Sequence, residues 1–244
     1  MSVRTLALIA AAGSGTRLGF STPKAFVELA GRTLLERSLD LIHGAHRVSH
    51  ALVIASADMM PRAQALLDNP ENLRRWQGMR VGLVRGGRER VDSVYQGLLA
   101  LEREYGRDDS LVLIHDAARC LTPSSMVAGV VDRAMDVLAR GTAVGAIPVV
   151  PVADTIKVVE QGQVVSTPPR ESLRAVQTPQ AFALDRLLEA NEAYQASAGP
   201  LATDDASLME MAGLPVSVVD GDARAFKITT PSDYRMAQLL LEER

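Results

Sequence analysis

A glycine-rich segment near the N-terminus holds the first residues suited to chemistry on an anion. The apolar residues 6–12 lead into Gly13 and Gly15, with Arg17 and Lys24 following. Backbone N–H groups in a glycine-rich concavity bind phosphate oxygens, and two cations can neutralise the charge that grows on a leaving pyrophosphate. The segment therefore indicates a phosphate-binding loop.

Two common glycine motifs do not fit this segment. A dinucleotide-binding fingerprint would place its third glycine at position 18, where the chain has Leu18, and no Gly-Lys-Ser or Gly-Lys-Thr of a P-loop follows. An ordinary turn with a solvated arginine and a solvated lysine stays open as an alternative, because these side chains are mostly exposed.

A second segment, RGGRERVDSV at residues 85–94, combines adjacent glycines with a hydroxyl group. Gly86 and Gly87 permit close backbone approach, and Ser93 offers its hydroxyl near the start of an expected helix. These features suit recognition of the edge of a base or a sugar. The alternative is a tight strand-to-helix connection whose charged residues form a solvated first turn.

A third segment, LVLIHDAARCLTP at residues 111–123, places Asp116 directly after an apolar run. A carboxylate at the end of a strand can accept hydroxyl hydrogen bonds or help to hold a cation, with Mg²⁺ the best candidate where phosphates bind. The alanines that follow leave room beside it. His115 fits a packed histidine at the end of a strand better than a catalytic base.

The elements that must position these residues alternate between strands and helices. Short apolar segments predict strands at residues 6–12, 51–55, 81–84, 111–114 and 143–148. Apolar residues spaced by about 3.6 residues predict helices between them, with Leu34, Leu35, Leu39 and Ile42 in one and Val91, Val94, Leu98 and Leu101 in another. This alternation predicts an α/β fold: a Rossmann-like, mostly parallel sheet with helices on both faces and ligands beyond the carboxyl ends of its strands.

Residues 154–179 interrupt the alternation. Two short apolar runs, 156–159 and 164–166, flank a turn at 160–162, and a proline-marked loop follows. This pattern predicts a protruding β-hairpin arm at about 154–168. Because an isolated two-stranded hairpin is marginal in water, we expect the arm to pack on a second copy of the chain in a symmetric dimer.

Composition limits the class of protein. With 244 residues, 47% apolar and 23% charged, the chain suits a globular protein, and we expect one domain over residues 1–244. The formal charge of −3 disfavours general nucleic-acid binding, and no apolar run reaches the roughly 18 residues of a membrane span. The single cysteine, Cys120, excludes an internal disulfide and a cysteine-rich zinc site and suits the reducing cytoplasm.

The chain resembles the 2-C-methyl-D-erythritol 4-phosphate cytidylyltransferase family of the nucleotidyltransferase superfamily. The resemblance rests on seven segments in order: AAGSGTRLG with PKAF, RGGRERVDSV, HDAAR, DTIK, RAVQTPQAF, TDDAS and AFKIT. It implies transfer of CMP from CTP to 2-C-methyl-D-erythritol 4-phosphate, giving 4-diphosphocytidyl-2-C-methyl-D-erythritol and pyrophosphate in the non-mevalonate isoprenoid precursor pathway.

The resemblance also implies the roles of individual residues. Those around CTP would be Ala11, Ala12, Gly13 and Gly15 at its backbone contacts, Gly87 and Ser93 at the cytosine, and Asp116 and Ala117 near the ribose and the acceptor. The catalytic cations would be Arg17, Lys24 and Lys227. The acceptor, a small polyol phosphate, would contact Arg119, Thr155, Arg170, Thr178 and Asp204. Mg²⁺ would be held mainly by the CTP phosphates, with no metal site built by the protein alone, and the arm would cross to the partner in a homodimer with composite sites.

Two positions depart from the family pattern. Arg88 stands where several relatives have an acidic or small residue beside the base, and Cys120 replaces the proline common after HDAAR. Backbone readout of the base is therefore expected in place of a side-chain contact.

Two other functions stay open. A ribitol 5-phosphate cytidylyltransferase would share most of the nucleotide-site motifs, and a non-catalytic nucleotide-binding regulator could use the same fold. The residues themselves favour catalysis. The phosphate oxygen of an acceptor is already ionised near neutral pH, so the reaction needs alignment and cations more than a base.

Overall fold

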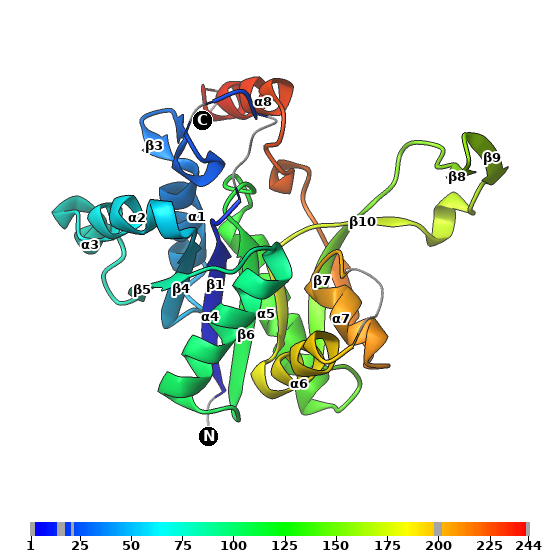
Figure 1. Ribbon diagram of the computed structural model, residues 1–244, viewed down its shortest axis with the longest axis horizontal. Coiled ribbons are helices and arrows are strands. Elements are labelled where there is room, and N and C mark those ends of the chain that lie inside the picture. The colour runs from blue at the N-terminus through cyan, green and yellow to red at the C-terminus, as the bar shows by residue number, and fades with distance from the viewer. Residues whose placement is uncertain (1–2, 14–17, 21, 198–201, 243–244) are drawn as a thin grey trace.

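The computed structural model describes residues 3–13, 18–20, 22–197 and 202–242, and a twisted central sheet runs through it (Figure 1). The strands of this sheet are β1 (Arg4–Ala10), β4 (His50–Ala55), β5 (Arg80–Arg85), β6 (Ser110–Asp116), β7 (Gly145–Pro151), β10 (Arg174–Val176), β11 (Gln180–Ala183) and β12 (Ser217–Asp220). Their order is β10-β7-β11-β6-β1-β4-β5, with β12 also paired to β7. Strands β6, β1, β4 and β5 are mutually parallel, which confirms the predicted class of sheet.

The five predicted strands are all present, with shifted ends. Strand β1 ends at Ala10, two residues before the predicted end; the Ala11 N–H still donates to the Ile54 carbonyl of β4 at 3.0 Å, and the chain then enters the loop. The predicted strand at 143–148 is β7, which starts at Gly145. Strand β11 was not predicted: it lies antiparallel between β6 and β7.

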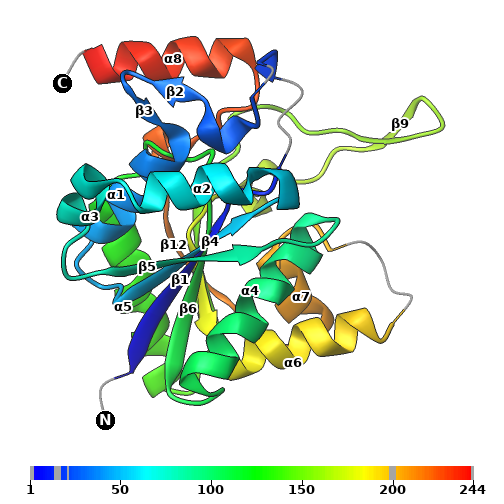
Figure 2. The same ribbon diagram turned by 60° about the vertical axis from the view of Figure 1, so that its left-hand side comes forward.

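Helices cover both faces of the sheet (Figure 2). On one face, α1 (Leu34–Gly44), α2 (Met60–Leu67) and α5 (Ser124–Ala139) pack on residues such as Ala7 and Ile9. On the other, α4 (Arg90–Tyr105), α6 (Leu184–Gln195) and α7 (Asp205–Met211) pack on Leu6 and Leu8. The alternation of inward side chains along β1 thus divides the core into two layers. The short α3 (Pro70–Arg75) follows α2 at the edge.

A third, smaller cluster joins the two ends of the chain. Helix α8 (Pro231–Glu242) packs on a small hairpin of β2 (Glu28–Leu29) and β3 (Arg32–Thr33). Its Tyr234 hydroxyl donates to the Glu28 carbonyl at 2.6 Å. The buried Leu18 and Cys120 belong to the same cluster. This contact brings the segment before α8 to the glycine-rich loop.

The predicted arm is present and stands away from the body of the protein (Figure 1). Its hairpin pairs β8 (Val158–Glu160) with β9 (Gln163–Ser166), and residues 153–167 are all exposed. The first strand is shorter than predicted, since residues 156–157 are not in it. Separately, none of the described helices combines the length and the apolar character needed to cross a membrane.

Candidate active site

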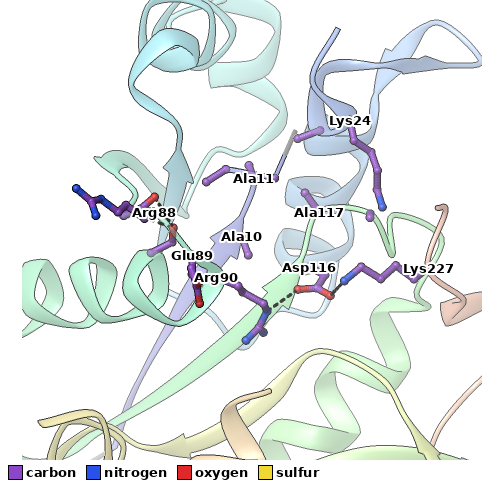
Figure 3. A pocket seen from close by; sticks show the side chains of 15 residues that line it. Ala10, Ala11, Lys24, Arg88, Glu89, Arg90, Asp116, Ala117 and Lys227 are labelled. Carbon is purple, nitrogen blue, oxygen red and sulfur yellow. Dashed lines mark hydrogen bonds and ion pairs between the residues drawn. The ribbon is translucent and has the colours of Figure 1, made fainter. Parts of the chain in front are cut away.

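A cavity of about 270 Å³ lies beyond the carboxyl ends of β1 and β6 (Figure 3). Its walls are the start of the glycine-rich loop, the connection from β5 to α4, the end of β6 and Lys227. Parallel strands end at the same edge of a sheet, so these segments meet although they are distant in sequence.

The cavity brings together most of the residues expected around the nucleotide. Those that line it are Ala11, Ala12, Gly13, Lys24, Gly87, Ser93, Asp116, Ala117 and Lys227. Gly15 and Arg17 lie outside the described residues. Arg88 also lines the cavity, and its guanidinium points away from Asp116 (Figure 3).

Asp116 is the charged centre of this cavity. Lys227 Nζ donates to its Oδ2 at 2.7 Å, and Arg90 Nε donates to its Oδ1 at 3.3 Å. Burial opposes ionisation, but the positive charges of Arg90 and Lys227 outweigh it and hold the pKa of the Asp116 carboxyl well below its ordinary value. The group is therefore a carboxylate at neutral pH.

Lys227 reaches Asp116 because its segment is attached beside β6. The Ile228 N–H donates to the Ala118 carbonyl at 2.9 Å, and the Ile228 side chain is buried in the cluster under α8. Lys227 itself lies at the rim, with its side chain 40% exposed. The C-terminal part of the chain thus supplies a cation to a site built mainly by the N-terminal half.

Lys24 enters the cavity from the glycine-rich side. It opens a 3₁₀ turn, Lys24–Phe26, that Pro23 starts and in which the Phe26 N–H donates to the Pro23 carbonyl at 2.9 Å. Ala25 and Phe26 are buried. This turn fixes the main chain of Lys24. Figure 3 shows the side chain of Lys24 extending toward the region of Asp116 and Lys227.

The connection from β5 to α4 is shaped by close contacts. Gly87 N–H donates to Ser93 Oγ at 3.1 Å, and a Cβ atom added at Gly87 would lie 2.4 Å from Cβ of Asp92. One added at Gly86 would lie 2.8 Å from Ser93 Oγ. Both glycines are therefore required by space, and the buried Ser93 hydroxyl fixes the loop whose backbone faces the cavity.

Arg90 and Asp205 were missed by the sequence-based prediction. Arg90 was considered only as part of the alternative, a solvated first turn, but its Nη2 donates to the buried Asp205 carboxylate at 2.7 Å while its Nε reaches Asp116. Burial disfavours the charged form of Arg90, yet Asp205 and Asp116 raise its pKa above the ordinary value. Burial raises the pKa of Asp205, an effect that the charge of Arg90 opposes. The contact at 2.7 Å supports an ionised pair. For Asp205, the sequence offered one signal, the two adjacent acidic residues of TDDAS.

Of the residues expected at the acceptor, Thr178 and Arg119 lie closest to the nucleotide cavity. Thr178 is buried and accepts the Asp116 N–H at 3.1 Å. Arg119 donates to the carbonyls of Ala225, at 2.7 Å, and of Val176, at 3.2 Å. Both lie next to the cavity without being among the residues that line it.

Asp204 caps α7, since its Oδ1 accepts the Ser207 N–H at 3.0 Å, and its Oδ2 accepts from Gln180 at 2.7 Å. Thr155 lies on the exposed arm and Arg170 at its base, where Arg170 Nη1 donates to the Ala153 carbonyl at 3.2 Å. Within one chain these two residues are not brought to the cavity.

The donor groups fit a metal that arrives with phosphates. Among the described residues, no three His, Cys, Asp or Glu side chains gather into a metal-binding group. The carboxylates lining the cavity are those of Glu89 and Asp116. Mg²⁺ is commonly bound by one or two carboxylates together with substrate phosphates, so this set is compatible with an ion held mainly by a nucleotide.

Comparisons with known proteins agree with this geometry. Residues 5–243 match the family model described as "IspD: 2-C-methyl-D-erythritol 4-phosphate cytidylyltransferase". The protein of that enzyme name from Corynebacterium jeikeium is 50% identical, over 99% of this chain and 98% of its own. The one from Saccharopolyspora erythraea is 46% identical, over 97% and 98%. A crystal structure of the enzyme from Thermus thermophilus is 34% identical, covers 99% of this chain and 100% of that chain, and superposes with a TM-score of 0.71.

Proposed function

Since the chain belongs to the 2-C-methyl-D-erythritol 4-phosphate cytidylyltransferase family, we propose that the cavity around Asp116 is its active site. The enzyme is a nucleotidyltransferase that transfers CMP from CTP to 2-C-methyl-D-erythritol 4-phosphate in the isoprenoid pathway. The observation that carries the proposed site is the ionised Asp116 held between Arg90 and Lys227, with Lys24 in the same cavity.

The chemistry follows from the charges at this site. A phosphate oxygen of the acceptor attacks the α-phosphorus of CTP; the new oxygen–phosphorus bond forms as the bond to pyrophosphate breaks and its electron pair leaves with pyrophosphate. No proton has to be removed from the acceptor, because a phosphomonoester is mostly a dianion near neutral pH. Lys24 and Lys227, with Arg17, neutralise the charge that grows on the phosphates, and Asp116 holds Lys227 in place.

The base and the ribose would be bound mainly by backbone groups. The main chain of residues 11–13, with Gly15, wraps the nucleotide, while the Gly86–Gly87 turn that Ser93 fixes faces the cytosine. Since neither glycine has room for a Cβ atom, the turn packs closely on its neighbours, and we propose that it limits the space for a larger purine. Asp116 and Ala117 lie at the ribose and the incoming acceptor.

The acceptor side would be completed by a second chain in a homodimer. The arm leaves Val159, Val164 and Val165 each more than half exposed, which favours a partner that covers them. Arg170 and Thr155, carried on this arm, would then grip the acceptor phosphate and hydroxyls in the partner's cavity. Arg119, Thr178 and Asp204 would supply the other wall.

Mg²⁺ would be held mainly by the CTP phosphates, in the cavity that Glu89 and Asp116 line, and would supply further neutralisation of phosphate charge. We take residues 1–244 as one catalytic domain, since both main core layers pack on the same sheet. The single cysteine, buried Cys120, whose thiol pKa burial raises to about 12, suits a cytoplasmic protein.

The test is pyrophosphate release from CTP with methylerythritol phosphate and with ribitol 5-phosphate as acceptors. We expect release with the first and far less with the second. Preference for ribitol phosphate would reject the acceptor, and no release with either would favour a regulator. Asp116→Asn should remove most of the activity, whereas Asp58→Asn, at an exposed surface carboxylate, is the control that should keep it.

A further inference from the structure

A histidine is buried directly behind the proposed active site, although the reaction needs no general base. His115 is the residue of β6 that precedes Asp116, and none of its surface is exposed. Its Nδ1 lies 3.2 Å from Thr178 Oγ1, and the ring also interacts with the backbone of Thr178 and Arg119. It is not among the residues lining the cavity, so it does not reach a substrate directly.

One hydrogen bond of Thr178 has a fixed direction, and the direction of the other depends on the tautomer of His115. The Asp116 N–H donates to Thr178 Oγ1 at 3.1 Å, so the oxygen acts there as an acceptor. The hydroxyl proton is left to be donated, and the His115 Nδ1 is the partner within reach. One hydroxyl therefore links the imidazole of His115 to the main chain of Asp116, provided that Nδ1 carries no proton.

The surroundings keep His115 neutral. Burial lowers the pKa of the imidazole to about 4; the charge of Asp116 raises it and the charge of Arg119 lowers it. At neutral pH the ring therefore carries one proton. If that proton is on Nε2, Nδ1 can accept from Thr178.

We propose that His115 is a positioning residue for CMP transfer: by accepting the Thr178 hydroxyl proton, it fixes the main chain of Asp116 and so the place of its carboxylate in the cavity. This inference rests on the proposed function in one respect, the role of Asp116. The two cations Arg90 and Lys227 hold the carboxylate of Asp116, and the Thr178 hydroxyl accepts its main-chain N–H. Displacement of a catalytic group by a fraction of an ångström slows an aligned reaction.

The first test compares two substitutions of His115. His115→Leu removes the acceptor and should lower kcat about tenfold, with little change in the KM for CTP. His115→Asn can place its Oδ1 near the position of Nδ1 and should recover much of the loss. His46→Asn, at an exposed histidine with positive φ that asparagine tolerates, is the control expected to match the wild type. A normal kcat for His115→Leu, or equal losses for both His115 variants, would overturn the proposal.

A double-mutant cycle separates positioning from a general structural role. Thr178→Val removes the hydroxyl at nearly the same volume. If His115 acts through that hydroxyl, His115→Leu should cause no further loss of kcat in the Thr178→Val enzyme, and Thr178→Ser should keep most of the wild-type rate. Independent, multiplying losses would refute the link.

A readout without activity covers the case in which these variants fold poorly. Nitrogen NMR of the wild-type imidazole should find Nδ1 unprotonated and Nε2 protonated at neutral pH, and the Thr178→Val variant should shift the Nδ1 resonance. A proton on Nδ1 in the wild type would end the proposal whatever the kinetics. An active Asp116→Asn enzyme would instead count against the proposed site, which keeps the two failures distinct.

Discussion

The cavity edge and the arm are built in opposite ways, although the proposed reaction uses both. At the cavity edge a carboxylate is buried and paired: Asp116 accepts from Lys227 at 2.7 Å and from Arg90 at 3.3 Å. At the base of the arm, Arg170 is exposed, and its guanidinium donates to the Ala153 carbonyl, just before the arm begins. In the proposed site, one chain would therefore preorganise the nucleotide half, and a partner chain would complete the acceptor half.

The physical origin of the difference is the core beneath each region. The cavity residues follow strands that pack between two buried layers, so their main chain is held from both sides. The arm has two short strands and no core, and a lone hairpin is marginal in water. Its geometry and its function should therefore depend on what covers it, whereas those of the cavity should not.

The largest expected effect is at the cavity edge. Lys24→Ala should lower kcat by about 10²- to 10³-fold, with a much smaller change in CTP affinity, because the ammonium acts on charge that develops in the transition state. Steady-state kinetics and calorimetric CTP binding measure the two quantities. The same result is expected for Arg17→Ala, and the exposed Arg140→Ala should serve as the neutral control. Normal turnover of both would make them ordinary solvated side chains.

The buried ion pairs should also matter for folding. Arg90→Ala leaves Asp205 buried without its partner and should lower the free energy of unfolding by about 3 kcal/mol. Arg107→Ala breaks contacts with Glu102 and Glu192 near the surface and should cost less than about 1 kcal/mol. Urea denaturation of both variants measures the contrast. Similar costs for the two would mean that burial does not set the value of these pairs.

The arm should affect the acceptor alone. A guanidinium can hold a phosphomonoester through two hydrogen bonds, which the ammonium of lysine does not reproduce in geometry. Arg170→Lys should therefore raise the KM for the acceptor about tenfold, while CTP binding stays near normal. A loss confined to CTP would place Arg170 on the nucleotide side and remove the contrast between the regions.

Mixed dimers test whether the arm serves the neighbouring chain. An Arg170→Ala chain retains Lys24, and a Lys24→Ala chain retains Arg170, so a heterodimer would have one site with both groups intact. At an acceptor concentration where each parent protein is impaired, mixing the two should restore part of the activity. If heterodimers form by mass and show no more activity than their parents, each site is built within one chain.

The sequence predicted what is local and missed what depends on distant pairing. The end of β6 was recognisable because an apolar run stops at Asp116, and the arm was recognisable by its turn and its short valine runs. Strand β11 was not, since the partner strands that it joins are set by the whole sheet.

The same limit applies to the site. Arg90 and Asp205 lie 115 positions apart, and local pattern gives no reason to pair them. Asp204 caps α7, while the adjacent Asp205 pairs with Arg90. Which partner each of two adjacent carboxylates takes is decided by how the helix docks, and this information is tertiary.

The smallest expected effect is on the free energy of unfolding. It should appear only at acid pH, where Asp116 binds a proton. Its pKa in the folded protein lies below the ordinary value of 3.8, so the folded carboxylate stays charged after the unfolded one has bound a proton. The stabilisation is therefore complete above pH 3.8 and is lost progressively as the pH falls below it. Urea denaturation across this range should show the wild type losing stability faster than Asp116→Asn. The difference between their free energies of unfolding should therefore narrow as the pH falls. Glu171→Gln, at an exposed position near the arm, is the control, and its free energy of unfolding should run parallel to that of the wild type. A constant gap for Asp116→Asn down to strong acid would show that Arg90 and Lys227 do not favour its charged form, and the cavity edge would then be no more preorganised than the arm.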